Sequence, residues 1–260
     1  MKIIRKILIL FAVLLIIVFP IACENSDSEE KVVLTVSAAI SLKDVMTEIK
    51  ENYLMLKPDI KINLNLGSSG SLQQQVEQGA DIDVFISADT SQMTALENKD
   101  LLIEESEKDL MGNKLVLITS NDSFLKEGTF YSVLDPSIEK LGVGEPLSVP
   151  AGKYAAEVFS SLDILESIKS KIVYAKDVRE VLTWVETGNV EAGVVYKTDA
   201  IISSKAKIIA TAPDDSHSPI IYSGAVIQST KNTTESLDFM NFLNGEEAKS
   251  IYEKYGFNRL

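Results

Sequence analysis

The stretch VVLTVSAAISLKDVMTEIKENYLMLKPDIKINLNLGSSGSLQQQVEQGADIDVFISA, residues 32–88, decides the fold. Short runs rich in β-branched residues alternate in it with amphipathic segments, in the order 32–38, 41–54, 60–66, 71–79 and 83–88. Strands that alternate with helices of about ten residues are typical of βαβ units on a mainly parallel sheet. This part of the chain is therefore predicted to be α/β.

The same alternation starts again near residue 113 and continues to the end of the chain. Strand-like and helix-like segments follow in the order 115–120, 141–146, 152–162, 172–175, 177–188, 191–196, 207–212, 220–228, 232–245 and 246–256. The last two are helices predicted to end at C-cap glycines, Gly245 and Gly256. We therefore predict two α/β lobes, one of residues 32–112 plus 218–260 and the other of residues 113–217.

Ligands of open α/β sheets bind beyond the carboxyl ends of the strands, so the loops after the strands are the candidates for a site. Five are of interest: SAAISLKD (37–44), GSSGSLQQQ (67–75), VPAGKYAAEVF (149–159), KDVREVL (176–182) and AGVVYKTDA (192–200). Taken alone, Ser41 and Asp177 read as N-caps and Tyr196 as a core residue. The 67–75 loop can direct amides and hydroxyls at an anion, but it lacks the lysine of a nucleotide-binding P-loop.

Charge and composition exclude several classes of protein. The chain has 25 basic and 38 acidic residues, a net charge of −13, and 45% hydrophobic residues. Nucleic acids bind clustered Lys and Arg, so this balance argues against a nucleic-acid partner. The apolar content is sufficient for a folded core.

The N-terminus has the pattern of an export signal. Lys2, Arg5 and Lys6 precede an apolar run over 7–19, which is shorter than the roughly 20 residues of a spanning helix. The segment ending in Ala22-Cys23 resembles a bacterial lipobox, although Pro20 stands where Leu is usual. We predict a lipoprotein signal peptide at 1–22, lipidation of Cys23 and a polar tether at 23–31, with the protein held outside the cytoplasm on the cell membrane.

The alternative for the N-terminus is a buried Cys23 thiol and an uncleaved anchor at 7–22. Because Cys23 is the single cysteine of the chain, a disulfide and a cysteine-based zinc site are excluded.

Nine short motifs in order give the chain a family resemblance: AAISLKD, GSSGSL, DVFISAD, GNKLVLI, VPAGKYA, DVREVL, GVVY, PDDSH and KYGF. Together they resemble the periplasmic molybdate-binding protein of ABC importers over about residues 32–257. The resemblance implies a two-lobed type II solute-binding fold, a mixed sheet flanked by helices in each lobe, that closes on molybdate or tungstate. It also implies delivery to an ABC permease, a monomer, no cofactor and no enzyme activity.

By motif position, the resemblance implies five ligand-binding residues: Ser41, Ser69, Ala151, Val178 and Tyr196. Mo or W is then bound as its oxyanion through these residues, with no direct metal ligand. Where family members often have a third serine and then threonine, this chain has Gly70 and Ser71.

These residue types suit a tetrahedral dianion. Molybdate offers only acceptor oxygens, and serine and tyrosine hydroxyls and backbone N–H groups can donate to it. Such bonds contribute about 1.5–3 kcal/mol each. Protonated phosphate is rejected because its proton would face a donor, whereas sulfate differs from molybdate only in size.

Four alternatives remain open. A receptor for another tetrahedral oxyanion such as sulfate would use the same fold. A serine hydrolase would need His217, the single histidine, as its base, but the chain has no GxSxG motif. A metal site would draw on carboxylates such as Asp81, Asp83 and Asp89, which lack metal-ligand spacing. A purely structural lipoprotein would bind none of these anions.

Overall fold

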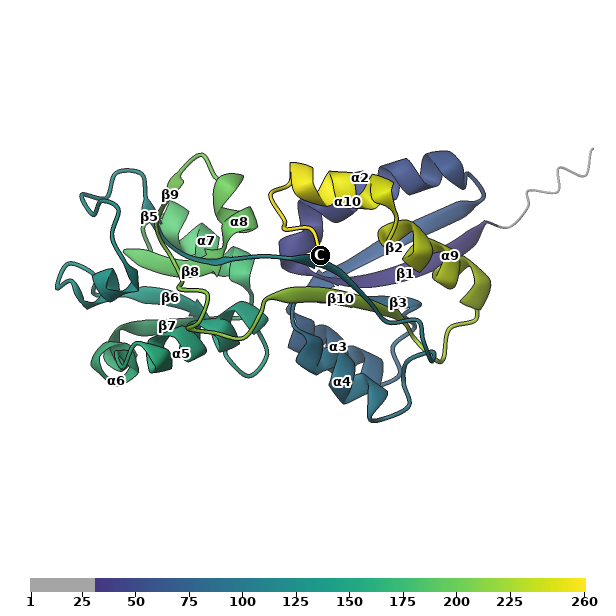
Figure 1. Ribbon diagram of the computed structural model, residues 1–260, viewed down its shortest axis with the longest axis horizontal. Helices are drawn as coiled ribbons and strands as arrows, with labels where there is room; N and C mark the ends of the chain where they lie inside the picture. Colours follow the sequence, from purple (N-terminus) through teal and green to yellow (C-terminus); the bar gives the residue numbers. More distant parts are fainter. Residues whose placement is uncertain (1–30) are drawn as a thin grey trace, which may run out of the picture. The chain divides into compact units, whose positions relative to one another are not determined.

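The computed structural model describes residues 31–260, and Val32–Leu260 form one compact unit that contains two five-stranded sheets (Figure 1). The predictions for the signal peptide, Cys23 and most of the tether lie outside the described residues. Among residues 31–260, no helix has the length and apolar content needed to cross a membrane.

The first sheet has the strand order β2-β1-β3-β10-β4. Its strands are β1 (Val32–Ala39), β2 (Ile60–Gly67), β3 (Val84–Ser87), β4 (Lys108–Gly112) and β10 (Ile221–Val226). Strands β1, β2 and β3 are parallel, and β10 lies antiparallel to both β3 and β4. The chain therefore returns to this sheet after residue 220.

The helices around the first sheet are η1 (Ile40–Leu42), α2 (Lys43–Leu56), α3 (Ser69–Glu77), α4 (Thr90–Glu97), α9 (Thr233–Leu243) and α10 (Glu246–Lys254). Figure 1 shows α2, α9 and α10 on one face of the sheet and α3 and α4 on the other. The Tyr53 ring of α2 packs against Phe239 and Phe242 of α9, with centroids 4.9 and 5.2 Å away. Aromatic packing thus fixes α9 to α2 beside the first sheet.

The second sheet has the order β7-β6-β8-β5-β9. Its strands are β5 (Leu115–Ser120), β6 (Leu141–Gly144), β7 (Ile172–Ala175), β8 (Ala192–Tyr196) and β9 (Ala206–Thr211). Strands β6, β7 and β8 are parallel, and β5 is antiparallel to β8 and β9.

The helices around the second sheet are η2 (Phe130–Leu134), α5 (Pro150–Ser161), α6 (Leu165–Ile168), η3 (Lys169–Lys171), α7 (Val178–Glu186) and α8 (Lys197–Ile201). Figure 1 shows α7 and α8 on one face of the sheet and α5 and α6 on the other. Strand β8 is buried throughout because helices cover both faces. Its last residue, Tyr196, is consequently held at the carboxyl end of the sheet.

The α/β prediction is confirmed, with two local corrections. Strand β4 was not predicted, since KDLMG carries two charges in five residues and pairs only because β10 lies beside it. Gly245 is not the C-cap of α9: Asn244 takes that place, and Gly245, with φ −79°, is the N-cap of α10. Gly256 follows α10 with φ +84°, a conformation that favours glycine.

The division into lobes at 112/113 and 217/218 stays a prediction, because the described chain forms one compact unit. The first sheet takes its strands from residues 32–112 and 221–226, and the second from residues 115–211. One buried apolar cluster includes residues of both sheets, and a smaller one lies among β3, β10, α3 and α4.

Candidate ligand-binding site

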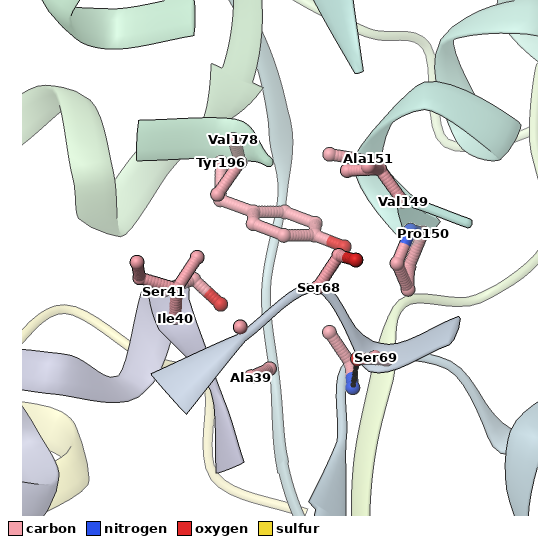
Figure 2. A pocket seen from close by; sticks show the side chains of 12 residues that line it. Ala39, Ile40, Ser41, Ser68, Ser69, Val149, Pro150, Ala151, Val178 and Tyr196 are labelled. Atoms are coloured by element: carbon pink, nitrogen blue, oxygen red, sulfur yellow. Dashed lines mark hydrogen bonds between the residues drawn. The ribbon is translucent and has the colours of Figure 1, made fainter. Parts of the chain in front are cut away.

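A small pocket lies where the carboxyl ends of strands from both sheets meet, with about 210 Å³ of empty space including its opening. Figure 2 shows its lining side chains. They are Ala39, Ile40, Ser41, Gly67, Ser68, Ser69, Ala88, Val149, Pro150, Ala151, Val178 and Tyr196. The structure therefore brings all five residues predicted for the site into one pocket.

Six strands place these residues. Strands β1, β2 and β3 end at the pocket on one side and lead to η1, α3 and α4; β6, β7 and β8 end at it on the other side. The N-termini of α3, α5 and α7 supply Ser69, Ala151 and Val178. Because the first N–H groups of a helix have no partner within the helix and carry the positive end of its dipole, this arrangement favours an anion.

Three of the predicted donors are buried hydroxyls. The Ser41 Oγ lies 2.9 Å from the Tyr222 hydroxyl, and the Ser69 Oγ accepts a hydrogen bond of 3.0 Å from the Ala88 N–H. Ser41 belongs to η1, and Leu42 is the N-cap of α2, so the alternative that Ser41 caps this helix is wrong. The hydroxyl groups of Ser41 and Ser69 therefore both lie next to the pocket.

The Tyr196 hydroxyl is buried and has no hydrogen-bond partner within residues 31–260, although its residue is only 1% exposed. An unpaired buried hydroxyl costs about 1–3 kcal/mol. Burial raises the pKa of Tyr196 well above its usual value, so the phenol keeps its proton. Figure 2 shows its hydroxyl end directed toward Ser68. The ring thus presents an unused donor to the pocket.

The two predicted backbone donors are free as well. Within the described part of the chain, no backbone hydrogen bond uses the N–H of Ala151 or Val178. Asp177 caps α7, as predicted, by accepting a hydrogen bond of 2.8 Å from the Glu180 N–H. The Asp177 side chain therefore accepts from the Glu180 N–H and leaves the Val178 N–H available to the pocket.

Three ion pairs flank the pocket, but no charged side chain lines it. Lys153 of α5 lies 2.6 Å from Asp89, and Arg179 of α7 lies 2.6 Å from Asp44 and also pairs with Asp199. Burial raises the pKa of Asp199 to about 7, against the opposing effect of Arg179. Each pair with Asp89 or Asp44 joins a helix beside the second sheet to residues beside the first.

Gly70 joins a loop of the first sheet to a loop of the second by a backbone hydrogen bond. Its N–H donates to the Ser148 carbonyl at 3.0 Å, and a Cβ at this position would lie 2.7 Å from that oxygen. A glycine is therefore required for the loops to approach this closely.

The residues of the enzyme and metal alternatives do not line the pocket. His217 is not in the pocket, and its Nδ1 lies 2.7 Å from the Ser218 carbonyl oxygen. Asp83 accepts from the Thr35 N–H and from Asn232, and Asp89 caps α4, so both are structural. Among residues 31–260, no cluster of three or more His, Cys, Asp or Glu side chains has the geometry of a metal site.

Sequence reasoning missed two kinds of residue. Ser68 lines the pocket, and its position next to Ser69 in GSSGS was a sufficient signal. Tyr222 contacts Ser41 from 181 positions away in the sequence and had no local signal.

Comparison with known proteins identifies the family. The model for the bacterial extracellular solute-binding protein family matches residues 34–258. The chain belongs to this family. Its members bind solutes outside the cytoplasm and are components of transport rather than enzymes, and the two sheets are the two lobes of the corresponding solute-binding fold.

Individual relatives cover nearly the whole chain. YvgL of Bacillus subtilis (strain 168), provisionally named as an ABC transporter substrate-binding lipoprotein, is 43% identical over 90% of this chain and 89% of its own. The molybdate-binding protein ModA of Haemophilus influenzae is 36% identical over 86% and 89%. A Clostridium difficile structure, provisionally described as the substrate-binding domain of a molybdenum ABC transporter, has 43% identity and a TM-score of 0.69 over 88% of this chain and 99% of its own.

Proposed function

We propose that this protein captures molybdate, and tungstate in the same way, outside the cytoplasm and delivers it to an ABC permease. The observation that carries the proposal is the meeting of five uncharged donors at one pocket with no charged lining: the hydroxyls of Ser41, Ser69 and Tyr196 and the amides of Ala151 and Val178. An anion with only acceptor oxygens satisfies such a set.

The energetics support a dianion without a lysine or arginine. Hydrogen bonds to a charged acceptor contribute about 1.5–3 kcal/mol each. The N-termini of α3, α5 and α7 each add a few tenths to about 2 kcal/mol. Together these terms offset the cost of removing the dianion from water. The names of the Haemophilus influenzae and Clostridium difficile relatives agree with molybdate as the ligand.

The two lobes are proposed to be residues 32–112 plus 218–260 and residues 113–217, in a monomer that closes on the anion. The strand membership of the two sheets supports this division, and the Lys153–Asp89 pair, which joins the two parts, supports closure. Small-angle scattering with and without molybdate measures closure. A smaller radius of gyration with molybdate is expected, and identical profiles would argue against closure.

The protein is also proposed to be anchored by lipid at Cys23, after removal of residues 1–22 and with 23–31 as the tether. The lipobox-like segment and the lipoprotein name of the Bacillus subtilis relative support this proposal. Mass spectrometry of the mature N-terminus tests this proposal, and an acylated Cys23 is expected. A Cys23→Ala variant is expected to be released from membranes.

Calorimetric titration of the protein with molybdate, tungstate, sulfate and phosphate tests the ligand. Molybdate and tungstate are expected to bind alike, sulfate more weakly because it is smaller, and phosphate the most weakly of the four. If sulfate bound more tightly than molybdate, the protein would be a receptor for sulfate, which is the alternative oxyanion. If none of the four anions gave a heat of binding, the proposal of a tetrahedral oxyanion receptor would be refuted.

Two serine variants locate the site. Ser41→Ala and Ser69→Ala are each expected to weaken molybdate binding by about 1–3 kcal/mol. Ser236→Ala is the matched control, because Ser236 is equally buried but lies in α9 away from the pocket. Unchanged affinity in both site variants would remove the assignment of the pocket.

A further inference from the structure

Asn113 has a fixed side-chain orientation behind the pocket. Its Oδ1 accepts a hydrogen bond of 2.8 Å from the Lys114 N–H, which can only donate. The Asn113 Nδ2 must therefore face the other way, where it donates to the Thr198 Oγ1 at 2.9 Å and to the Tyr222 hydroxyl at 3.3 Å. The amide orientation follows from these partners because the two ends of an asparagine side chain are a donor and an acceptor.

The orientation of Asn113 determines the direction of the next hydrogen bond. Within residues 31–260 the Tyr222 hydroxyl has two hydrogen-bond partners, the Asn113 Nδ2 and the Ser41 Oγ. Since it accepts from Asn113, the remaining partner for its single proton is the Ser41 Oγ, 2.9 Å away. Burial raises the pKa of Tyr222, so this proton stays in place.

Packing holds Tyr222 in this position. The residue is fully buried, and its ring lies 5.7 Å from that of Tyr196 and 5.4 Å, edge to face, from that of Phe257.

The Ser41 hydroxyl already accepts the proton of Tyr222. Its own proton is therefore available to a ligand in the pocket.

Ser69 has the same polarity by a different route. Its Oγ accepts from the Ala88 N–H, which leaves its hydroxyl proton for the ligand. The fold thus supplies both serines with a donor from behind. Each serine then faces the ligand with its proton, and one of its two acceptor lone pairs is already occupied from behind.

We propose that Asn113 and Tyr222 are positioning residues that direct the Ser41 proton into the pocket and thereby make the site reject oxyanions that carry a proton. This proposal rests on the proposed function. It assigns specificity to a pair of residues that lie behind the pocket and do not line it.

The variant Tyr222→Phe tests the proposal. Without the phenolic proton, the Ser41 Oγ is free to accept a hydrogen bond from a ligand. Competition titrations at pH 7 measure the ratio of the inorganic phosphate and molybdate dissociation constants. This ratio is expected to fall by about 5- to 150-fold, the range that corresponds to relief of one unpaired buried polar group.

Two controls separate the relay from a general loosening. Tyr252→Phe removes a buried tyrosine hydroxyl that donates to the Leu243 carbonyl and is not hydrogen-bonded to Ser41, Asn113 or Tyr222. It is expected to leave the phosphate-to-molybdate ratio unchanged. In a Ser41→Ala background, Tyr222→Phe is expected to have no further effect on the ratio, because the acceptor that it exposes is gone.

Asn113→Asp provides a second test that does not depend on the folding of Tyr222→Phe. A carboxylate accepts the Tyr222 proton, so Ser41 must donate to Tyr222 and turns its acceptor toward the ligand. Weaker molybdate binding and a lower phosphate-to-molybdate ratio are expected.

The outcomes distinguish the two levels of the argument. A wild-type protein that binds no molybdate would refute the proposed function. A wild-type protein that binds molybdate, with the ratio unchanged in Tyr222→Phe and Asn113→Asp or lowered equally in Tyr252→Phe, would overturn the relay alone. A fall in the ratio confined to the relay variants supports it.

Discussion

Replacing Gly152 by alanine is expected to move the N-terminus of α5 and the amide that it presents to the pocket. A Cβ at Gly152 would lie 2.0 Å from the Gly144 carbonyl oxygen and 2.5 Å from its carbon, both backbone atoms of β6. An ordinary carbon–oxygen contact is about 3.3 Å or more. The helix must therefore withdraw from β6 by about 1.3 Å.

This displacement has two measurable consequences. Overpacking of this kind costs about 1–3 kcal/mol, which for a domain of this size lowers the melting temperature by about 2–12 °C. The adjacent Ala151 N–H moves with the helix. Loss of its hydrogen bond to a charged ligand is expected to weaken molybdate binding by about 10- to 150-fold.

Thermal unfolding without ligand and calorimetric titration with molybdate measure the two effects separately. Gly112→Ala is the control, because its Cβ would meet its nearest neighbours at 3.5 Å, an ordinary contact. An unchanged melting temperature would refute the steric argument. A lower melting temperature with unchanged affinity would show that the Ala151 amide does not bind the ligand.

Three further perturbations test other parts of the site. Tyr196→Phe removes an unpaired buried hydroxyl, so the unliganded protein should be no less stable while molybdate binding, measured by calorimetry, weakens about tenfold or more. Gly70→Ala places a methyl group 2.7 Å from the Ser148 oxygen and should weaken molybdate binding without lowering the melting temperature of the free protein. If the melting temperature of the free protein also fell, the contact would belong to the open form as well. Burial, opposed by Arg179, raises the pKa of Asp199 to about 7 in the folded protein, from an unfolded value near 3.9. The contribution of Asp199 to the free energy of unfolding is therefore fully present below about pH 4 and is lost as the pH rises through 7. Denaturant unfolding at pH 5 and pH 8 should show a smaller pH dependence in Asp199→Asn, and an equal dependence would contradict the raised pKa.

Local patterns in the sequence predict most of the elements and the loops that form the pocket. The alternation over residues 32–88 determines βαβ units because side-chain periodicity differs between strands and helices. Parallel strands place their carboxyl ends at one edge, which is why the loops at Ser41 and Ser69 meet. Asp177 caps α7 through atoms only three residues apart.

Only the tertiary structure decides how these groups are oriented. Strand β4 depends on β10 as its partner, and the polarity of the Ser41 hydroxyl depends on Tyr222 and Asn113, which come from distant parts of the chain. A hydroxyl group can donate or accept, and its residue type does not say which. Its role is set by the donors that folding places behind it, and those contacts have no local pattern in the sequence.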